Sequence, residues 1–173
     1  MNDAGIVVEF SKGEAGKGQH EIDLRYTDAL TMADRHAIYK NGAKEIAALS
    51  GRSITFMAKY SMEEVGSSCH LHSSVWSADG ERSLMWDEGA PHHMSDTMRG
   101  WLGGIIATGA EFAWLFAPYV NSYKRYQPES WAPTALAWGR DNRTCGYRIV
   151  GHGAGFRMES RVPGADVNPY LAY

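Results

Sequence analysis

Residues 157–172 read RMESRVPGADVNPYLA, and the start of this stretch gives one sheet face an unusual character. Successive residues of a β-strand point to opposite faces, so Arg157, Glu159 and Arg161 share one face of a strand expected over 157–162. Arginine holds carboxylates and phosphates in a planar fork, whereas glutamate binds hard divalent cations. The pattern predicts a ligand-binding face, although a cross-strand ladder of salt bridges would give the same sequence.

Two glutamates lie on and before a strand expected over 20–26. Glu21 belongs to the charged face of this strand, and its other face is apolar,. Glu14 lies in a glycine-rich segment over 13–18, which predicts a loop but lacks the spacing and the Ser or Thr of a P-loop. Both glutamates could also be plain solvated residues, so their meaning depends on what faces them.

Two histidines recur at strand spacing in GSSCHLHSSVW, residues 66–76. His70, His72 and Ser74 share one face of a strand expected over 69–76, and the strand rise places the two imidazoles about 7 Å apart. Imidazole is a common metal ligand. An HxH pair on a strand is nevertheless more often simply half-exposed.

Further arginines complete this polar set, because Arg143 and Arg148 bracket a turn-like TCGY segment. A solvated sheet face usually mixes lysine, threonine, serine and glutamine, whereas arginine, histidine and glutamate dominate here. Together these residue types predict a site that binds Mg²⁺ or Mn²⁺ and a polyanion such as the phosphates of a nucleotide.

Hydrophobic periodicity predicts two helices. Apolar residues at steps of three and four predict a helix over 28–50, with Thr27 as N-cap. A second helix is expected over 95–116, with Ser95 as N-cap. Further strands are expected at 6–10, 54–60, 84–86, 134–138 and 147–150, with 54–60 beside 69–76. Several strands in succession predict an α+β fold with a largely antiparallel sheet flanked by helices.

Composition narrows the class of protein. The 173 residues are 44% hydrophobic and 21% charged, as expected of one globular domain,. The net charge of -3 leaves no basic excess for binding nucleic acid or an acidic membrane surface,. Cys69 and Cys145 are too few for a disulfide framework, so we expect a reducing cytoplasm. No signal peptide is evident, and the most apolar stretch, 101–116, is shorter than the roughly 20 residues of a membrane span.

Six ordered blocks resemble the glutamine synthetase superfamily, and more narrowly the catalytic domain of bacterial class I-like glutamate–amine ligases. The resemblance runs from Gly5 to the last residue. The blocks are KGQHEIDLRY (17–26), FMAKY (56–60), GSSCHLHSS (66–74), NSYKRY (121–126), WGRDNRT (138–144) and RMESRVPGADVNPYLA (157–172).

The resemblance implies that residues 1–173 form part of a catalytic domain with the glutamine synthetase/guanidino kinase-like fold. It also implies ATP-dependent ligation of glutamate to ammonia or an amine through γ-glutamyl phosphate. ATP would be the co-substrate, and Mg²⁺ or Mn²⁺ the cofactor. The family assembles as double rings, so a homo-oligomer is implied for full-length members.

The roles of individual residues follow from the resemblance. Glu14 and Glu21 match ligands of a first metal, and His70 and Glu159 match ligands of a second. The implied contacts to substrate glutamate come from Gly66, Arg125 and Arg161. The implied nucleotide contacts come from Glu9, His72, Ser74, Arg143, Arg148 and Arg157. The implied catalytic arginines are Arg125, Arg143 and Arg148.

The sequence departs from the family in two ways. Family members also have an N-terminal sheet domain, an upstream ExE pair of metal ligands and C-terminal helices. These parts are not among the 173 residues, so we expect little or no turnover from the 173 residues alone. Glutamine synthetases proper also carry a flap glutamate six residues after the arginine matched by Arg125, where this chain has Trp131. An indole can enclose an alkyl amine but cannot accept a proton. We therefore expect a preference for an organic amine, such as a polyamine.

Two other functions stay open. One is an inactive relative that only binds nucleotide and metal or assembles with full-length subunits. The other is a guanidino kinase, which has a similar antiparallel sheet and arginine-lined phosphate site. The HxH and RxExR patterns speak against the kinase, because such enzymes need no protein histidine on their metal.

Overall fold

The computed structural model describes all 173 residues. A two-stranded sheet pairs β1 (Val8–Gly13) with β2 (His20–Leu24), and a four-stranded sheet has the order β3-β6-β5-β4. Its strands are β3 (Leu71–Ser73), β4 (Trp138–Arg140), β5 (Tyr147–Val150) and β6 (Arg157–Ser160). The helices are α1 (Ala29–Leu49), α2 (Asp96–Thr108), α3 (Ala113–Phe116), α4 (Val120–Tyr123) and α5 (Pro169–Ala172), with 3₁₀ turns at Asn2–Ala4, Pro91–His93 and Gly153–Gly155.

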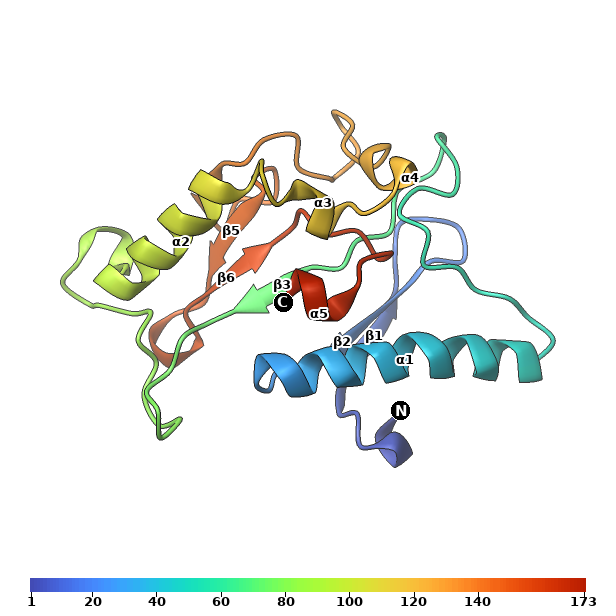
Figure 1. Ribbon diagram of the computed structural model, residues 1–173, viewed down its shortest axis with the longest axis horizontal. Coiled ribbons are helices and arrows are strands. Elements are labelled where there is room, and N and C mark those ends of the chain that lie inside the picture. Colours follow the sequence, from blue (N-terminus) through green and yellow to red (C-terminus); the bar gives the residue numbers. More distant parts are fainter.

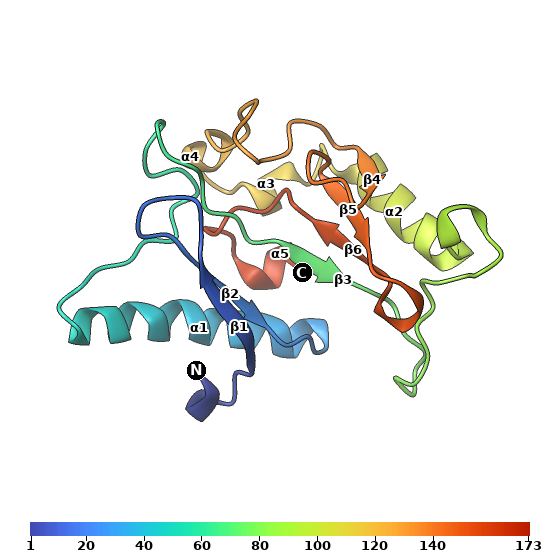
Figure 2. The same cartoon turned by 180° about the vertical axis from the view of Figure 1, so that it is seen from behind.

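The helices and sheets are arranged so that one face of the sheets carries no helix. Figure 1 shows α2 lying along the four-stranded sheet and α1 in front of the β1–β2 hairpin. Figure 2, from the opposite side, shows both sheets in front of these helices. All strand pairs are antiparallel except β4 with β5, which confirms the α+β prediction of a largely antiparallel sheet.

The hydrophobic core lies between α2 and the four-stranded sheet. Met98 and Leu102 of α2 pack with Tyr147 and Ile149 of β5 and Met158 of β6, all at most 4% exposed. These inward residues alternate along β5 and β6 with charged ones, as the pleat requires. Burial of one face therefore aims the arginines and Glu159 toward the other.

Both predicted long helices form, but their ends differ from expectation. α1 is capped by Asp28, whose side chain accepts from Thr31 N, and not by Thr27. Ser95 caps α2 as predicted, by accepting from Met98 N. α2 ends at Thr108, well before residue 116. At Gly109 the chain packs so tightly that a Cβ would lie 2.8 Å from the Tyr147 hydroxyl.

Several strand predictions were wrong. Residues 54–60 form no strand. The main chain of Lys59 is hydrogen-bonded to a side chain instead of to a neighbouring strand. Asn121 Oδ1 accepts from the Lys59 N–H at 3.0 Å, and Asn121 Nδ2 donates to the Lys59 carbonyl at 2.7 Å. Residues 84–86 contribute only an isolated bridge between Trp86 and Met94. In 54–60 the apolar residues Ile54, Met57 and Tyr60 are exposed, and no neighbouring strand pairs with the segment.

Other strands form with shifted bounds. The strand expected over 69–76 shortens to β3. The strand expected over 134–138 forms as β4, which starts at Trp138 and ends at Arg140. β2 and β6 each end two residues before the expected position. β1 starts at Val8 rather than residue 6 and runs to Gly13, because Lys12 and Gly13 pair with Glu21 and His20. No helix combines the length and apolar character that crossing a bilayer would need.

Candidate functional site

Glu159 lies at the centre of the open sheet face. On β6 it is paired in register with His72 of β3 on one side and with Arg148 of β5 on the other. Strands only about 4.8 Å apart bring the side chains of such partners into contact. The register therefore assembles a histidine, a glutamate and an arginine from segments far apart in the sequence.

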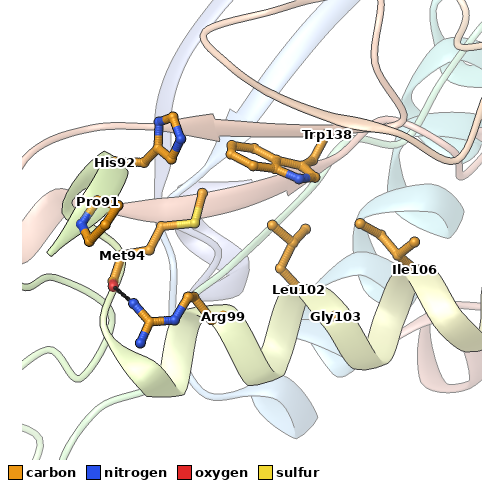
Figure 3. Close-up of a pocket in the computed structure, with 8 residues that line it drawn as sticks. All are labelled: Pro91, His92, Met94, Arg99, Leu102, Gly103, Ile106 and Trp138. Atoms are coloured by element: carbon orange, nitrogen blue, oxygen red, sulfur yellow. Dashed lines mark hydrogen bonds between the residues drawn. The ribbon is translucent and has the colours of Figure 1, made fainter.

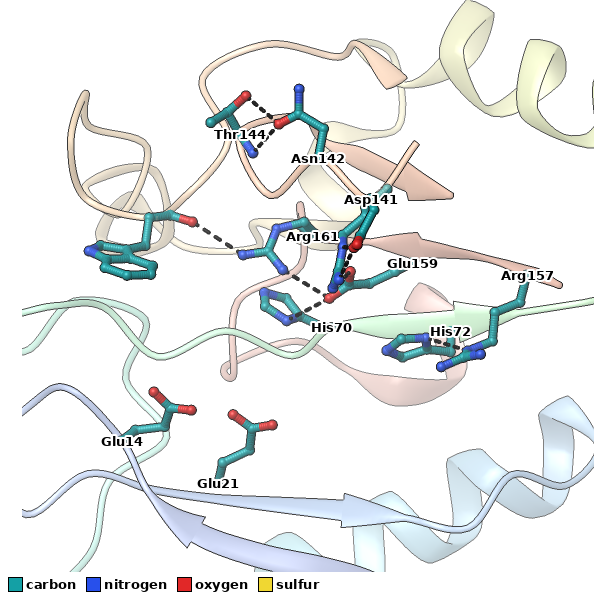
Figure 4. A network of polar contacts seen from close by, with 12 residues as sticks. Glu14, Glu21, His70, His72, Asp141, Asn142, Thr144, Arg157, Glu159 and Arg161 are labelled. Atoms are coloured by element: carbon teal, nitrogen blue, oxygen red, sulfur yellow. Dashed lines mark hydrogen bonds and ion pairs between the residues drawn. The ribbon is translucent and has the colours of Figure 1, made fainter. Parts of the chain in front are cut away.

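Three side chains share the carboxylate of Glu159 (Figure 4). Oε1 lies 3.1 Å from His70 Nδ1 and accepts from Arg161 Nη1 at 2.9 Å, and Oε2 accepts from Arg148 Nη1 at 3.0 Å. Burial alone would raise the pKa of Glu159, but the bond from His70 and the neighbouring cationic groups lower it to about 2. Glu159 is thus a buried, ionised carboxylate surrounded by guanidinium groups.

His70 and Glu159 lie at hydrogen-bond distance, which is also the spacing of two neighbouring ligands on one cation. The Nδ1 to Oε1 distance is 3.1 Å. Neighbouring ligands of an octahedral Mg²⁺ are about 3 Å apart when each bond is about 2.1 Å long. The predicted pair for one metal therefore fits this donor geometry.

His72 and Arg157 form a second contact on the same face. Arg157 Nε donates to His72 Nδ1 at 2.9 Å, and Arg157 Nη1 donates to the carbonyl of Gly155 at 2.9 Å. An accepting Nδ1 requires the neutral tautomer of the imidazole that carries its proton on Nε2. The structure thus brings two of the predicted nucleotide residues together.

The predicted glutamate pair lies on the β1–β2 hairpin. Figure 4 shows the carboxylates of Glu14 and Glu21 pointing toward His70 and Glu159. Burial and the neighbouring Glu14 raise the pKa of Glu21 to about 7, whereas hydrogen bonds from Glu21 and Lys12 lower the pKa of Glu14 to about 2. The interacting pair therefore takes up its first proton at a higher pH than an isolated glutamate would,.

Lys12 takes part in this pair, although sequence reasoning missed it. Its Nζ lies 2.7 Å from Glu14 Oε1 and 3.4 Å from Glu21 Oε2. Strand alternation gives no signal for this contact, because β1 ends at Gly13 and Glu14 lies beyond it,. Asp23, on the same strand face as Glu21, also has a buried oxygen, Oδ2, without a partner.

The hairpin is tied to the His70 segment by Gln19. Its Nε2 donates to the Gly66 carbonyl at 3.0 Å and to Ser67 Oγ at 3.1 Å. This bridge sets the hairpin carboxylates opposite the four-stranded sheet. The two pairs nevertheless stay separate, because no group of three or more His, Cys, Asp or Glu side chains converges on a metal-sized site.

The predicted glutamate-binding residues lie deeper. Arg125 is 3% exposed, and its Nη2 donates to the carbonyls of Arg161 and Val162. A Cβ at Gly66 would lie 2.6 Å from Arg125 Cγ and 2.7 Å from the Ala58 carbonyl, so only glycine fits there. Arg125 supports the main chain that carries Arg161, and its buried Nε has no partner.

Trp131 connects to the site through its main chain. Its carbonyl accepts from Arg161 Nη2 at 3.4 Å, whereas its side chain is 70% exposed. Its φ of 65° places the residue in the left-handed region, which is uncommon for a bulky residue,. The main chain of Trp131 therefore contacts the arginine that bonds Glu159, while its side chain faces solvent.

Three predicted residues stay outside the network. Glu9 is an exposed residue at the bulge of β1. Ser74 follows β3, and its hydroxyl accepts from Trp76 Nε1. Arg143 is exposed on the loop after β4 and makes no hydrogen bond or ion pair with the protein. Their assignment to nucleotide stays a prediction.

Asp141 was not expected and contacts the network through Arg148. Arg148 Nε donates to Asp141 Oδ1 at 2.9 Å, and Nη2 donates to the same oxygen. No periodicity singles out this aspartate, because it lies in a loop.

A cavity of 540 Å³ lies elsewhere, between α2 and β4 (Figure 3). It is lined mainly by apolar side chains, including Leu102, Ile106 and Trp138. None of the predicted site residues lines it. The open polar face, rather than this cavity, is the candidate functional site.

The whole chain is similar to known proteins. The family model described as glutamine synthetase, catalytic domain, matches residues 1–173. Gamma-glutamylethanolamide synthetase GlnA4 of Streptomyces coelicolor is 58% identical over 172 residues, which cover 99% of this chain and 36% of that protein. Glutamate–isopropylamine ligase of a Pseudomonas species is 45% identical over 172 residues, covering 99% of this chain and 37% of that one.

A solved structure is also similar to this chain. The structure of GmaS in complex with ADP has a TM-score of 0.89 and 36% identity, and the match covers 99% of this chain and 40% of that one. The chain thus spans well under half the length of the relatives it matches.

Proposed function

Because the chain belongs to the glutamine synthetase catalytic-domain family, we propose that its polar sheet face is part of the active site of an ATP-dependent glutamate–amine ligase. The observation that carries the proposal is the contact set around Glu159. A buried ionised carboxylate meets an imidazole within 3.1 Å and two guanidinium groups within 3.0 Å. Such a set suits phosphates and divalent cations better than it suits an apolar ligand.

The reaction would proceed by phosphoryl transfer and then displacement. A γ-carboxylate oxygen of glutamate attacks the γ-phosphorus of ATP, the bond to the ADP oxygen breaks, and γ-glutamyl phosphate forms. The amine nitrogen then attacks the acyl carbon, phosphate leaves, and the nitrogen loses a proton to give the amide. Both steps depend on positioning and on charge stabilisation.

Each group of residues has a distinct part in this scheme. Arg148 and Arg161 would orient phosphate or carboxylate oxygens, since their guanidinium groups already lie side by side on Glu159. Arg157 and His72 would hold the nucleotide farther along β6 and β3. Divalent cations, held by His70 with Glu159 and by Glu14 with Glu21, would neutralise phosphate charge.

We also propose that the amine is an organic amine rather than ammonium. The support is Trp131, whose carbonyl bonds Arg161 and whose exposed indole could offer apolar and cation–π contact to an alkylammonium,. Two relatives are named for ethanolamide and isopropylamine products or substrates. A polyamine remains one candidate among such amines.

Nucleotide and metal binding test the site directly. We expect the 173-residue chain to bind ADP in the presence of Mn²⁺, measured by isothermal titration calorimetry. Glu159→Gln should weaken this binding at least tenfold, whereas Glu111→Gln, on an exposed residue away from the site, should not. Absence of Mn²⁺-dependent ADP binding would contradict the proposal.

Turnover separates the two candidate roles. The chain would be incubated with Mg²⁺, ATP and glutamate, and with ethanolamine, isopropylamine, putrescine or ammonium, and γ-glutamyl products would be measured by mass spectrometry. An organic amine product in excess of glutamine supports the amine proposal, and a preference for ammonium contradicts it. Binding without any product agrees both with an incomplete ligase site and with a relative that only binds nucleotide, so only product formation discriminates between the two roles.

A further inference from the structure

The loop between β4 and β5 has a tightly constrained path. The two strands run parallel, with Arg140 paired to Ile149, yet only residues 141–146 separate them. The loop must therefore double back beside β4. It does so over Gly139, where a Cβ would lie 2.8 Å from the Cβ of Asn142.

Local hydrogen bonds fix this loop. Asn142 Oδ1 accepts from Thr144 N at 2.9 Å and from Thr144 Oγ1 at 2.8 Å (Figure 4). The main-chain N–H of Asp141 donates to the Ile149 carbonyl at 2.9 Å. Asp141 has a φ of 46°, a left-handed conformation that aspartate tolerates better than most residues,. The backbone at Asp141 is thus held in one uncommon geometry.

This geometry directs the Asp141 carboxylate onto Arg148. Oδ1 accepts from both Nε and Nη2 of Arg148, while the opposite end of the same guanidinium, Nη1, donates to Glu159 at 3.0 Å. Bonds at both ends fix the plane of the group. Three of the five N–H donors of an arginine are used in this way, which leaves two for a ligand.

Asp141 makes no side-chain contact with any other member of the site. Its side chain is 76% exposed, whereas that of Arg148 is 17% exposed. Arg148 therefore lies between Asp141 and the proposed phosphate-binding face. Asp141 thus reaches the site by hydrogen bonds only through Arg148, and its charge also acts on Arg143 and Arg140.

We propose that Asp141 is a positioning residue that presets Arg148 to receive a phosphate oxygen. The proposal rests on the proposed function of the site. An arginine already held at both ends loses less conformational freedom when it binds a ligand. Without Asp141, the Nε end of Arg148 would be free to rotate away from the sheet face, and each binding event would have to order it again.

Two substitutions with graded effects and one matched control test this. Asp141→Asn keeps the left-handed backbone and an accepting oxygen but loses the charge, and Asp141→Gly also keeps the backbone but removes the side chain. Asp96→Asn is the control, because Asp96 holds Arg99 in a similar pair away from the site. Affinities for ADP and for adenosine would be measured calorimetrically with Mn²⁺, and folding by circular dichroism.

We expect ADP affinity to fall about three- to fivefold in Asp141→Asn and about tenfold in Asp141→Gly. Adenosine affinity should not change in either variant, because only the phosphates contact Arg148. Asp96→Asn should bind both ligands as the unsubstituted chain does. If Asp141→Gly does not fold, the Asp141→Asn result decides.

Unchanged or tighter ADP binding in a folded Asp141 variant would overturn this inference alone. An equal loss for ADP and adenosine would also overturn it, because it would indicate general damage to the fold. Failure of the unsubstituted chain to bind ADP would overturn the proposed function together with this inference. The two failures are therefore distinguishable.

Discussion

Lys12 and Glu21 are direct cross-strand partners on the β1–β2 hairpin, and Lys12 Nζ lies 3.4 Å from Glu21 Oε2 while also bonding Glu14 at 2.7 Å. An ammonium group therefore lies against the two carboxylates that are proposed to bind a metal. The protein supplies its own cation to this pair, and a divalent cation would have to compete with it.

We predict that Lys12→Gln strengthens Mn²⁺ binding about two- to fivefold. An exposed ion pair of this kind is weak, and it no longer opposes the metal once the ammonium is gone. Free Mn²⁺ would be quantified by electron paramagnetic resonance. Lys17→Gln is the control. Lys17 lies in the loop of the same hairpin, but it pairs with Glu64 and not with Glu14 or Glu21. Weaker Mn²⁺ binding in Lys12→Gln would show that the lysine assists the metal instead.

We predict that Glu159→Gln lowers the free energy of unfolding by about 2–3 kcal/mol. The change leaves Arg161 and Arg148 close together without the anion that separates them, and breaking a buried ion pair is costly,. Urea denaturation followed by tryptophan fluorescence measures the effect. A loss of less than about 0.5 kcal/mol would mean that solvent already screens these charges.

We predict that Gly66→Ala destabilises the chain by about 1–3 kcal/mol. The added methyl would overlap Arg125 Cγ and the Ala58 carbonyl, and a tightly packed position tolerates extra volume poorly,. Gly104→Ala in α2 is the matched control, since nothing lies within 4 Å of its added Cβ. That helical substitution should stabilise the chain by about 0.5–1 kcal/mol. Equal effects at the two positions would contradict the packing argument.

We predict that stability falls as pH decreases from about 6.5 to 4 because of His36. The side chain is buried against Tyr173, whose hydroxyl lies 3.0 Å from Nδ1, and burial together with Lys40 lowers its pKa to about 4. The unfolded chain, with a pKa of about 6.5, takes up the proton first, so acid favours unfolding. The loss should be on the order of 2 kcal/mol.

The variant His36→Gln isolates this contribution. Urea denaturation at pH 7.5 and pH 4.5 should show a smaller drop for His36→Gln than for the unsubstituted chain. Other titrating groups, such as Glu21, act in both proteins and cancel in the comparison. The same drop in both proteins would assign the acid sensitivity to another group.

Much of the site was readable because strand alternation is a local property. The spacing in RMESRV and CHLHS places charged side chains on one face of β6 and β3 whatever lies around them. The contacts between Glu159 and Arg161 and between His72 and Arg157 agree with this periodicity and with the antiparallel register. Both long helices were likewise visible from their apolar repeats and from the cap at Ser95.

The strand at 54–60 failed for a different reason. Its apolar alternation was real, but a strand also needs a partner, and Asn121 satisfies the main chain of Lys59 instead. The break after Thr108 depended on the close approach of Tyr147 to Gly109. Neither contact has a signature within its own segment.

The sequence by itself determined the α+β class, the family and the charged faces of the strands, because these depend on residue type and on spacing over a few positions. Only the tertiary structure decided that Arg125 supports the main chain from inside, that Lys12 joins the two hairpin glutamates, and that Asp141 holds Arg148. Each of these depends on where the chain returns after a turn, and that path is set by packing across the whole fold rather than by neighbours in the sequence.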